Sequence, residues 1–304
     1  MFHRNVNQKL ALFIILHHNK SYTFKLFRIL HVGVNMPKRL IPAARQDKIR
    51  KYLQKNQFVN LTKLVDRLGV SESTIRRDLD KLEKEGFLER THGGALLSKK
   101  ISEEPGFVQS ENVNPNEKKW IGAAASQLVE SGETIFIASG TTTAKIARHL
   151  NKRKDLTDIT IITNNVSAAL EIHNKNFKVI LTGGVLRQAA NALGGRFAVN
   201  VINQVFADKS FVGADGLSFK YGCTSPAENE AETSKLMIEH TQGKAVLVAD
   251  HSKWGIISNY HVAQLHEFHT YITDPGIPET DLNTLKDQNL EILVCDETGI
   301  LPKS

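Results

Sequence analysis

Cysteine is scarce in this 304-residue chain, and long apolar runs are lacking. Only Cys223 and Cys295 occur, and they stand far apart in no metal-binding or redox spacing. This scarcity excludes a disulfide-stapled extracellular scaffold and fits a protein of the reducing cytoplasm. The apolar run at residues 10–16 is far shorter than the roughly 20 residues that a membrane-spanning helix needs. We therefore expect a cytoplasmic protein without a membrane partner.

Acidic residues are missing from the first 35 positions, where five Lys/Arg residues stand without any Asp or Glu. Residues 36–100 contain 16 basic and 8 acidic residues, whereas residues 101–304 contain 18 basic and 24 acidic residues. The net charge of +7 therefore comes from the N-terminal third of the chain. A basic segment joined to an acidic one predicts a polyanionic partner for the basic segment only.

Residues 1–35 are basic and apolar, and no small-residue cleavage site follows their apolar run. We expect them to form a poorly ordered extension, or to be translated upstream sequence ahead of a start at Met36. An amphipathic helix lying in a membrane interface is the alternative.

The stretch "SESTIRRDLDKLEKEG", residues 71–86, predicts an amphipathic helix. Ser71 can cap its first amides and Gly86 suits its end. Ile75, Leu79 and Leu82 are spaced by four and three, so they form one buried stripe. Taken alone, the other face is typical of a solvated surface with charge pairs such as Asp80–Lys84. That face carries Ser73, Arg77, Lys81 and Lys84, with Arg76 on its flank.

The neighbouring segments change that interpretation. Residues 45–55 and 60–68 each place apolar residues on one helical face, and Gly69 then breaks the chain before residue 71. Two short helices around a glycine turn predict a helix-turn-helix, whose second helix lies in the DNA major groove. After Gly86, "FLER" and "ALLS" flank a Gly-Gly turn and predict a hairpin. This hairpin is a wing with Arg90 and His92 at its tip, where phosphate or the minor groove is in reach.

Residues 42–97 resemble the DNA-binding module of DeoR-type bacterial transcription regulators. The resemblance implies that residues 59–78 read DNA and that Asp78 braces the fold. Arginine can bind guanine edges bidentately, and hydroxyls can anchor phosphates. The residues that carry the resemblance are Arg45, Ile49, Leu53, Ser71, Thr74, Ile75, Arg76, Arg77, Asp78 and Leu79, followed by "THGGA". We expect the DNA contacts to come from Ser71, Ser73, Thr74, Arg76, Arg77, Lys81, Arg90 and His92.

An α/β effector domain with a mainly parallel sheet is expected over residues 119–297, after a polar linker at residues 98–118. Short apolar runs alternate there with helical patterns. The runs are "TIFIA" (134–138), "ITIIT" (159–163), "FKVILT" (177–182), "KSFVG" (209–213) and "KAVLVA" (244–249).

Ligands bind beyond the carboxyl ends of parallel strands, and small and polar residues follow each predicted strand. The loop "SGTTT", residues 139–143, opens a helix and can cradle an anion with its amides and hydroxyls. It matches neither a nucleoside-triphosphate loop nor a dinucleotide fingerprint, so a small phosphate monoester fits best. A serine cap in a tight turn is the alternative. The candidate effector-binding residues are Ser139, Gly140, Thr141, Thr142, Thr143, Asn164, Gly183, Gly184, Arg187, Asp215, Lys235, Asp250 and Lys253.

Residues 116–297 resemble the DeoR-type effector domain, which is similar in fold to ribose-5-phosphate isomerase. The resemblance implies a phosphorylated sugar as effector. Ala138 departs from the family, which usually has an acidic residue before this loop, and the departure bears on one polar contact to the sugar and on which sugar is bound. The fold relation supplies an alternative function, sugar-phosphate isomerisation with Asp215 as base. After Asp215 there is one nearby lysine, Lys220, and no run of glycines. We therefore expect Asp215 to bind sugar hydroxyls instead, and we expect no enzyme activity.

The sequence therefore predicts a repressor of a sugar-catabolism operon that binds double-stranded operator DNA and responds to a phosphorylated sugar. A homo-oligomer, dimer or tetramer, is expected because one small module buries too little surface for selective binding. We expect no cofactor. Cys223 is expected to be a packed small residue, since no partner base is evident. "HVAQLHEFH" holds His261, His266, Glu267 and His269, but their spacing is typical of an exposed polar stretch rather than a metal site.

Overall fold

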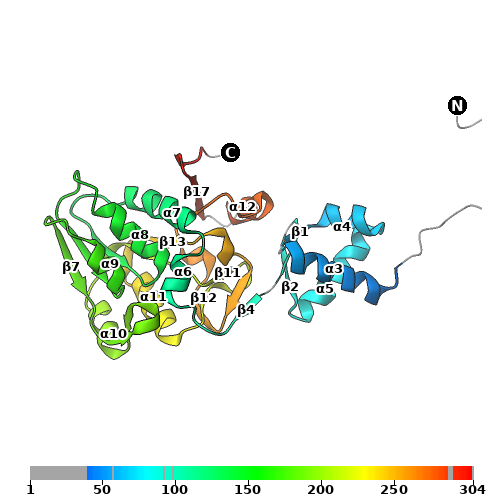
Figure 1. Ribbon diagram of the computed structural model, residues 1–304, viewed down its shortest axis with the longest axis horizontal. Coiled ribbons are helices and arrows are strands. Elements are labelled where there is room, and N and C mark those ends of the chain that lie inside the picture. The colour runs from blue at the N-terminus through cyan, green and yellow to red at the C-terminus, as the bar shows by residue number, and fades with distance from the viewer. Residues whose placement is uncertain (1–39, 57, 92, 98, 287–289, 303–304) are drawn as a thin grey trace, which may run out of the picture. The chain divides into compact units, whose positions relative to one another are not determined.

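The computed structural model describes residues 40–56, 58–91, 93–97, 99–286 and 290–302 (Figure 1). The predicted extension at residues 1–35 and the wing residue His92 lie outside the described residues.

The N-terminal module is a winged helix-turn-helix. Its helices are α3 (Pro42–Asn56), α4 (Leu61–Leu68) and α5 (Glu72–Lys84). The predicted wing is confirmed as the antiparallel hairpin of β2 (Leu88–Thr91) and β3 (Gly94–Leu97). A strand that the sequence did not reveal, β1 (Phe58–Asn60), pairs antiparallel with β3 and completes a sheet of order β1-β3-β2.

Local sequence explains where these helices begin and end. Asn60 caps α4 by accepting a hydrogen bond from the Thr62 amide at 2.8 Å, and Gly69, at φ 63°, ends it in the left-handed region. The predicted stripe of α5 is confirmed, because Ile75, Leu79 and Leu82 are fully buried in the module's core. The predicted cap is wrong in one detail. Ser71 holds the N-cap position, but its hydroxyl contacts other side chains and no helix amide.

The C-terminal domain is α/β, as predicted, and its main sheet has the order β18-β17-β16-β13-β10-β5-β6-β7. All neighbouring strands in it are parallel except the β17–β18 pair. The five predicted strands are present, and β16 and β17 extend the sheet beyond them. The strands are β5 (Thr134–Ile137), β6 (Ile159–Thr163), β7 (Phe177–Leu181), β10 (Ala207–Val212), β13 (Thr241–Val248), β16 (Thr270–Thr273), β17 (Glu291–Asp296) and β18 (Gly299–Ile300).

Helices cover both faces of this sheet because strand side chains alternate between two apolar clusters. Ile135 and Ile137 pack in a cluster with residues of α7 (Pro115–Gln127), α8 (Thr141–Leu150) and α9 (Val166–Glu171). Phe136 packs on the other side with residues of α10 (Arg196–Ile202), α11 (Glu228–Glu239) and α12 (Glu279–Lys286). The sheet and its helices therefore form three layers, and because the strands run parallel, the loops that follow them lie at one edge of the sheet.

The predicted linker at residues 98–118 contains regular structure. It holds β4 (Lys99–Ile101), which pairs with β14 (Ile256–Ser258), then helix α6 (Phe107–Glu111) and the start of α7. Phe107 of α6 is buried, so this part of the chain packs on the domain rather than merely connecting it.

Besides the β4–β14 pair, short strands of the described residues form two further small sheets. One has the order β11 (Gly216–Ser218), β12 (Gly222–Ser225) and β15 (Tyr260–Ala263), and the other pairs β8 (Val185–Arg187) with β9 (Ala192–Gly194). Within the described part of the chain, no helix is both long enough and apolar enough to span a bilayer.

Candidate DNA-binding face and sensor cleft

The outer face of α5 presents hydroxyls and cations to solvent. Opposite the buried stripe, Ser73, Arg77 and Lys81 are exposed, and Arg76 is exposed on the flank. Thr74 is half-buried, and its hydroxyl lies 2.8 Å from that of Ser71. A helix face with this composition can contact both base edges and phosphates in a major groove.

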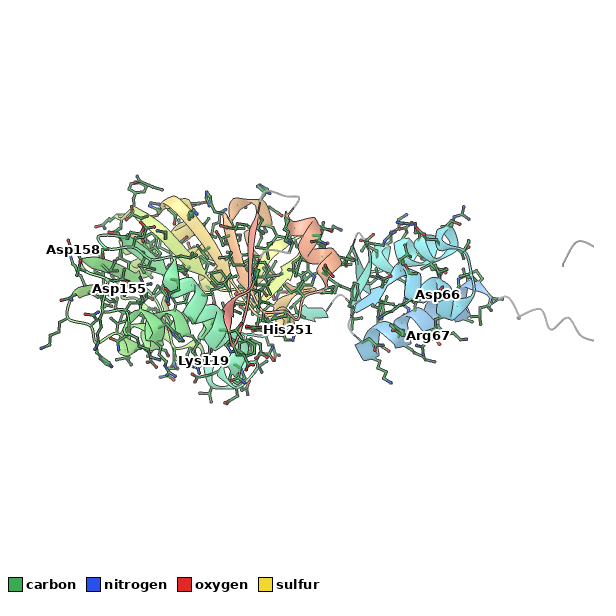
Figure 2. All side chains as sticks on the ribbon, turned by 90° about the horizontal axis from the view of Figure 1, so that it is seen from above. Asp66, Arg67, Lys119, Asp155, Asp158 and His251 are labelled. Carbon is green, nitrogen blue, oxygen red and sulfur yellow. The ribbon has the colours of Figure 1, made fainter. Side chains whose placement is uncertain are left out.

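Several cations of the module are already paired. Arg76 forms an ion pair with Glu72 one turn earlier, at 2.6 Å, and Arg90 of the wing pairs with Asp80. Asp80 therefore does not form the charge pair with Lys84 that the spacing suggested. Arg67 of α4 is labelled in Figure 2. Its guanidinium carbon lies 4.9 Å from the centroid of the Tyr52 ring. Among the described residues, Arg77 forms no ion pair, so its guanidinium is available for a partner.

Asp78 braces the module. Its buried carboxylate accepts hydrogen bonds from the Arg45 guanidinium and, at 3.0 Å, from Gln46 Nε2. Since Arg45 and Gln46 belong to α3, this contact holds α5 against the first helix of the module.

The loop at residues 139–143 joins β5 to α8 and opens into a cleft of about 60 Å³. Gly140 precedes α8 at φ 127°, a conformation that side chains rarely adopt. The first-turn amides of α8 have no partners within the helix, so they and the helix dipole favour an anion. The residues lining the cleft are Glu104, Pro105, Phe107, Ser110, Ser139, Gly140, Thr141, Thr142, Thr143, Ala190, Gly213, Ala214, Asp215, Glu230 and Lys253.

The structure therefore brings seven of the predicted effector residues together, namely the five of the loop with Asp215 and Lys253. Arg187 joins them through its contacts with two lining carboxylates, those of Glu104 and Glu230. The short helix η2 (His251–Lys253) supplies Lys253. His251 anchors η2 because its Nδ1 lies 2.6 Å from Asp274 Oδ2, a contact that raises the pKa of the imidazole.

The other predicted effector residues lie outside the lining of this cleft. Asn164 donates to the Leu193 carbonyl at 3.1 Å, which fastens β9 to the end of β6. Gly184 allows close chain approach, because a Cβ there would lie 2.5 Å from a backbone oxygen. Gly183 beside it has φ 72°. Lys235 is exposed and lies 3.8 Å from Glu239, so its ammonium is on the outer face of α11. Asp250 is buried and accepts hydrogen bonds from Asn114 and Ser252.

Two acidic residues of the cleft were missed by sequence reasoning. Glu230 of α11 accepts a hydrogen bond from the Ser139 hydroxyl at 2.9 Å, and Arg187 Nη1 lies 3.5 Å from it. Burial raises the pKa of Glu230 to about 8, and the nearby carboxylates of Asp215 and Glu104 act in the same direction. Glu104 pairs with Arg187. Glu104 stands in a stretch that looks like a linker, and Glu230 in a charged helical stretch, so neither had a local signal.

Asp215 faces the same environment. Burial raises its pKa, while the charge of Lys253 and a hydrogen bond from Ser225 at 3.0 Å lower it. The cleft thus combines anion-binding amides, two cations and carboxyl groups that can accept or donate hydrogen bonds to hydroxyls. That combination suits a ligand with both an anionic group and several hydroxyls.

Lys118 of α7 fastens the segment that forms one wall of the cleft. Its buried ammonium donates to the carbonyls of Ser110 and Val113, the latter at 2.7 Å, and burial lowers its pKa to about 8. Lys145 of α8 pairs with Glu111 at 2.6 Å and holds α6 from the other side.

The surroundings of the histidine-rich stretch and of Cys223 favour structural roles for these residues over metal binding or nucleophilic chemistry. His269 Nδ1 accepts a hydrogen bond from the Ala245 amide at 3.2 Å. His261 lies 3.2 Å from the Gln264 amide group. In the described ranges, no group of three or more His, Cys, Asp or Glu side chains is arranged to hold a metal ion. Cys223 is fully buried, and burial raises the pKa of its thiol, which disfavours the nucleophilic thiolate.

Comparisons with known proteins match both parts of the chain. Residues 45–100 match the DeoR-like helix-turn-helix domain, and residues 113–275 match the DeoR C terminal sensor domain. The uncharacterized HTH-type transcriptional regulator YulB of Bacillus subtilis is 35% identical over 83% of this chain and 96% of its own. The HTH-type transcriptional repressor GlcR of the same organism is 31% identical over 82% of this chain and 95% of its own.

Among solved structures, ribose 5-phosphate isomerase A of Methanocaldococcus jannaschii is similar over 46% of this chain and 55% of its own. The TM-score is 0.35 and the identity 19%, so this likeness decides nothing about function.

Proposed function

This chain belongs to the DeoR family of DNA-binding transcription regulators, and from that premise we propose that it represses a sugar-use operon under the control of a phosphorylated sugar. The operator is bound by the module at residues 42–97, and the sugar by the domain at residues 119–297. We propose that the protein acts in the cytoplasm, where it meets both the operator DNA and the phosphorylated sugar.

The observation that carries this proposal is the composition of the sensor cleft. The loop at residues 139–143 offers helix amides and hydroxyls to a phosphate, and Lys253 lines the same space. Asp215 and Glu230 line the same cleft as partners for sugar hydroxyls, and Arg187 lies beside Glu230. A phosphate monoester of a sugar carries both kinds of group on one small molecule.

On the DNA side, α5 is proposed as the recognition helix. Its exposed face carries the hydroxyls and cations that major-groove binding uses, and Arg77 is the principal base-reading candidate. One module of this size buries too little surface for tight selective binding, so we propose that a dimer or tetramer reads paired half-sites. Repression, rather than activation, is supported by one relative, GlcR of Bacillus subtilis, which is a transcriptional repressor.

Sugar-phosphate isomerisation is the second candidate, because Asp215 shares the cleft with Lys253 and is positioned to act as a base. The named relatives are transcription regulators, which favours binding without turnover. Steady conversion of an aldose phosphate to a ketose phosphate, lost on Asp215→Asn, would make this candidate the better one.

Thermal-shift screening of sugar phosphates against their unphosphorylated parents tests the main proposal. A sugar phosphate should raise the melting temperature and release operator DNA, because the cleft's donors then meet their anion. The parent sugar should do neither. An equal response to the free sugar would show that the cleft does not recognise the phosphate group.

A further inference from the structure

Glu104 occupies a position in the sensor cleft that an anionic ligand would compete for. We propose that its carboxylate is a built-in occupant of the Arg187 site, and that a phosphorylated ligand displaces it together with residues 104–110. This inference rests on the proposed function and adds how the same site is regulated.

Glu104 and Glu230 both contact the guanidinium of Arg187. Arg187 Nη2 forms an ion pair with Glu104 Oε1, and Arg187 Nη1 lies 3.5 Å from Glu230 Oε2. A guanidinium can donate two parallel hydrogen bonds to one carboxylate or phosphate. A phosphate that reaches Arg187 therefore competes with Glu104 for the same donors.

The wall formed by residues 104–110 narrows the cleft. The enclosed space of about 60 Å³ has room for only a few water molecules. Four of the lining residues, Glu104, Pro105, Phe107 and Ser110, come from this one segment, so its displacement opens the cleft most directly.

Displacement of Glu104 also changes the charge balance of the cleft. Three acidic residues, Glu104, Asp215 and Glu230, surround two cations, Arg187 and Lys253. Removal of the Glu104 carboxylate leaves two acidic residues against the two cations, so the excess of negative charge that opposes a dianionic phosphate is lost. The hydrogen bond between Glu104 and Glu230 contributes to the raised pKa of Glu230, so it is lost at the same time.

The displaced segment leads directly into the DNA-binding module. Leu97, the last residue of β3, precedes Glu104 by seven positions in the chain. Lys118 and the Lys145–Glu111 pair hold the far end of the segment to α7 and α8. On its other side the segment follows β4, which pairs with β14, so movement at residues 104–110 reaches the module through this strand and couples the sensor cleft to it.

The test compares Glu104→Gln with Glu103→Gln in the full chain. The two carboxylates are neighbours in sequence, but Glu103 is exposed and lies outside the cleft lining, so its variant is the matched control. Inorganic phosphate is the probe, titrated by calorimetry against chloride at equal ionic strength. Hydrogen exchange of the amides at residues 106–111 is measured with and without phosphate.

The Glu104→Gln variant should bind phosphate about fivefold or more tightly than the wild type, the usual scale of coupling between competing states. Exchange at residues 106–111 should be faster in this variant without phosphate, and should become faster in the wild type when phosphate is added. The Glu103→Gln variant should match the wild type in both measurements.

Unchanged phosphate affinity in Glu104→Gln would overturn displacement and leave the proposed function standing, because the wild type would still bind the anion. Slower exchange at residues 106–111 on phosphate addition would overturn it too, since the segment would then close over the ligand. Failure of the wild type and of both variants to bind phosphate would contradict the proposal that an anion displaces Glu104. The sugar-phosphate screen would then decide separately whether the proposed function survives.

Discussion

Arg45 on α3 and Asp78 on α5 form a buried ion pair at the centre of the helix-turn-helix module. Their positions are 33 residues apart, and Gln46 donates a further hydrogen bond to the same carboxylate. The pair fixes α5 on α3 from the buried side, which leaves the outer face of α5 free for DNA. The stability of the module and its ability to bind DNA can therefore be separated by substitution.

Removal of Asp78 should destabilise the module strongly. The Asp78→Ala variant leaves the buried guanidinium of Arg45 uncompensated, a loss of about 3–5 kcal/mol in the free energy of unfolding. Urea denaturation followed by circular dichroism measures it. Asp47→Ala removes the exposed carboxylate paired with Lys51 at 2.9 Å and should cost at most about 1 kcal/mol. Equal stability of the two variants would show that Asp78 does not brace the module.

Removal of Arg77 should weaken DNA binding without unfolding the module. Its side chain lies opposite the buried stripe of α5, so Arg77→Ala should lose about 1–3 kcal/mol of operator affinity and little stability. Electrophoretic mobility shifts at matched salt measure the affinity. Arg148→Ala, which removes an exposed cation paired with Glu171 at 2.5 Å in the sensor domain, is the control. Normal operator binding by Arg77→Ala would show that this face of α5 does not enter the groove.

Removal of the anion-binding groups should abolish the response to a sugar phosphate. Thr142→Val with Lys253→Ala takes a hydroxyl and a cation from the cleft lining but leaves the module at residues 42–97 unchanged. Operator binding should persist, while the thermal shift and the release from operator should both disappear. Lys235→Ala, on the exposed face of α11, should leave the response intact. A double variant that still responds would place the phosphate elsewhere.

The pH dependence of stability should report on Glu230. Its pKa is raised from 4.5 to about 8 by burial, so the folded state binds the proton more tightly than the unfolded state does. The stabilisation from the protonated acid is complete below pH 4.5 and is lost as the pH rises toward about 8. Glu230→Gln stays neutral, so its melting temperature should fall less over this range than that of the wild type. The exposed neighbour Glu232→Gln should follow the wild-type curve, and the same curve for Glu230→Gln would exclude a raised pKa.

Patterns within single elements were predictable from the amino-acid order. The stripe of Ile75, Leu79 and Leu82, the turn at Gly69 and the loop at residues 139–143 all appear where local periodicity and turn chemistry indicated them. Each depends on neighbours within a few residues, because helix period and glycine conformation are local properties of the chain. The edge at which the loops after the strands gather was also foreseeable, since parallel strands share one direction.

The partners of individual side chains depended on the tertiary structure. Glu104 and Glu230 meet at Arg187 because the fold brings a segment before α6, the β8 strand and α11 together. Lys235 and Glu230 lie on one helix, yet only Glu230 faces the cleft. No local sequence pattern distinguishes an acidic side chain that lines a cleft from one on the solvent-exposed surface. The difference arises from which elements pack together, and long-range packing sets the burial and charge around each carboxylate.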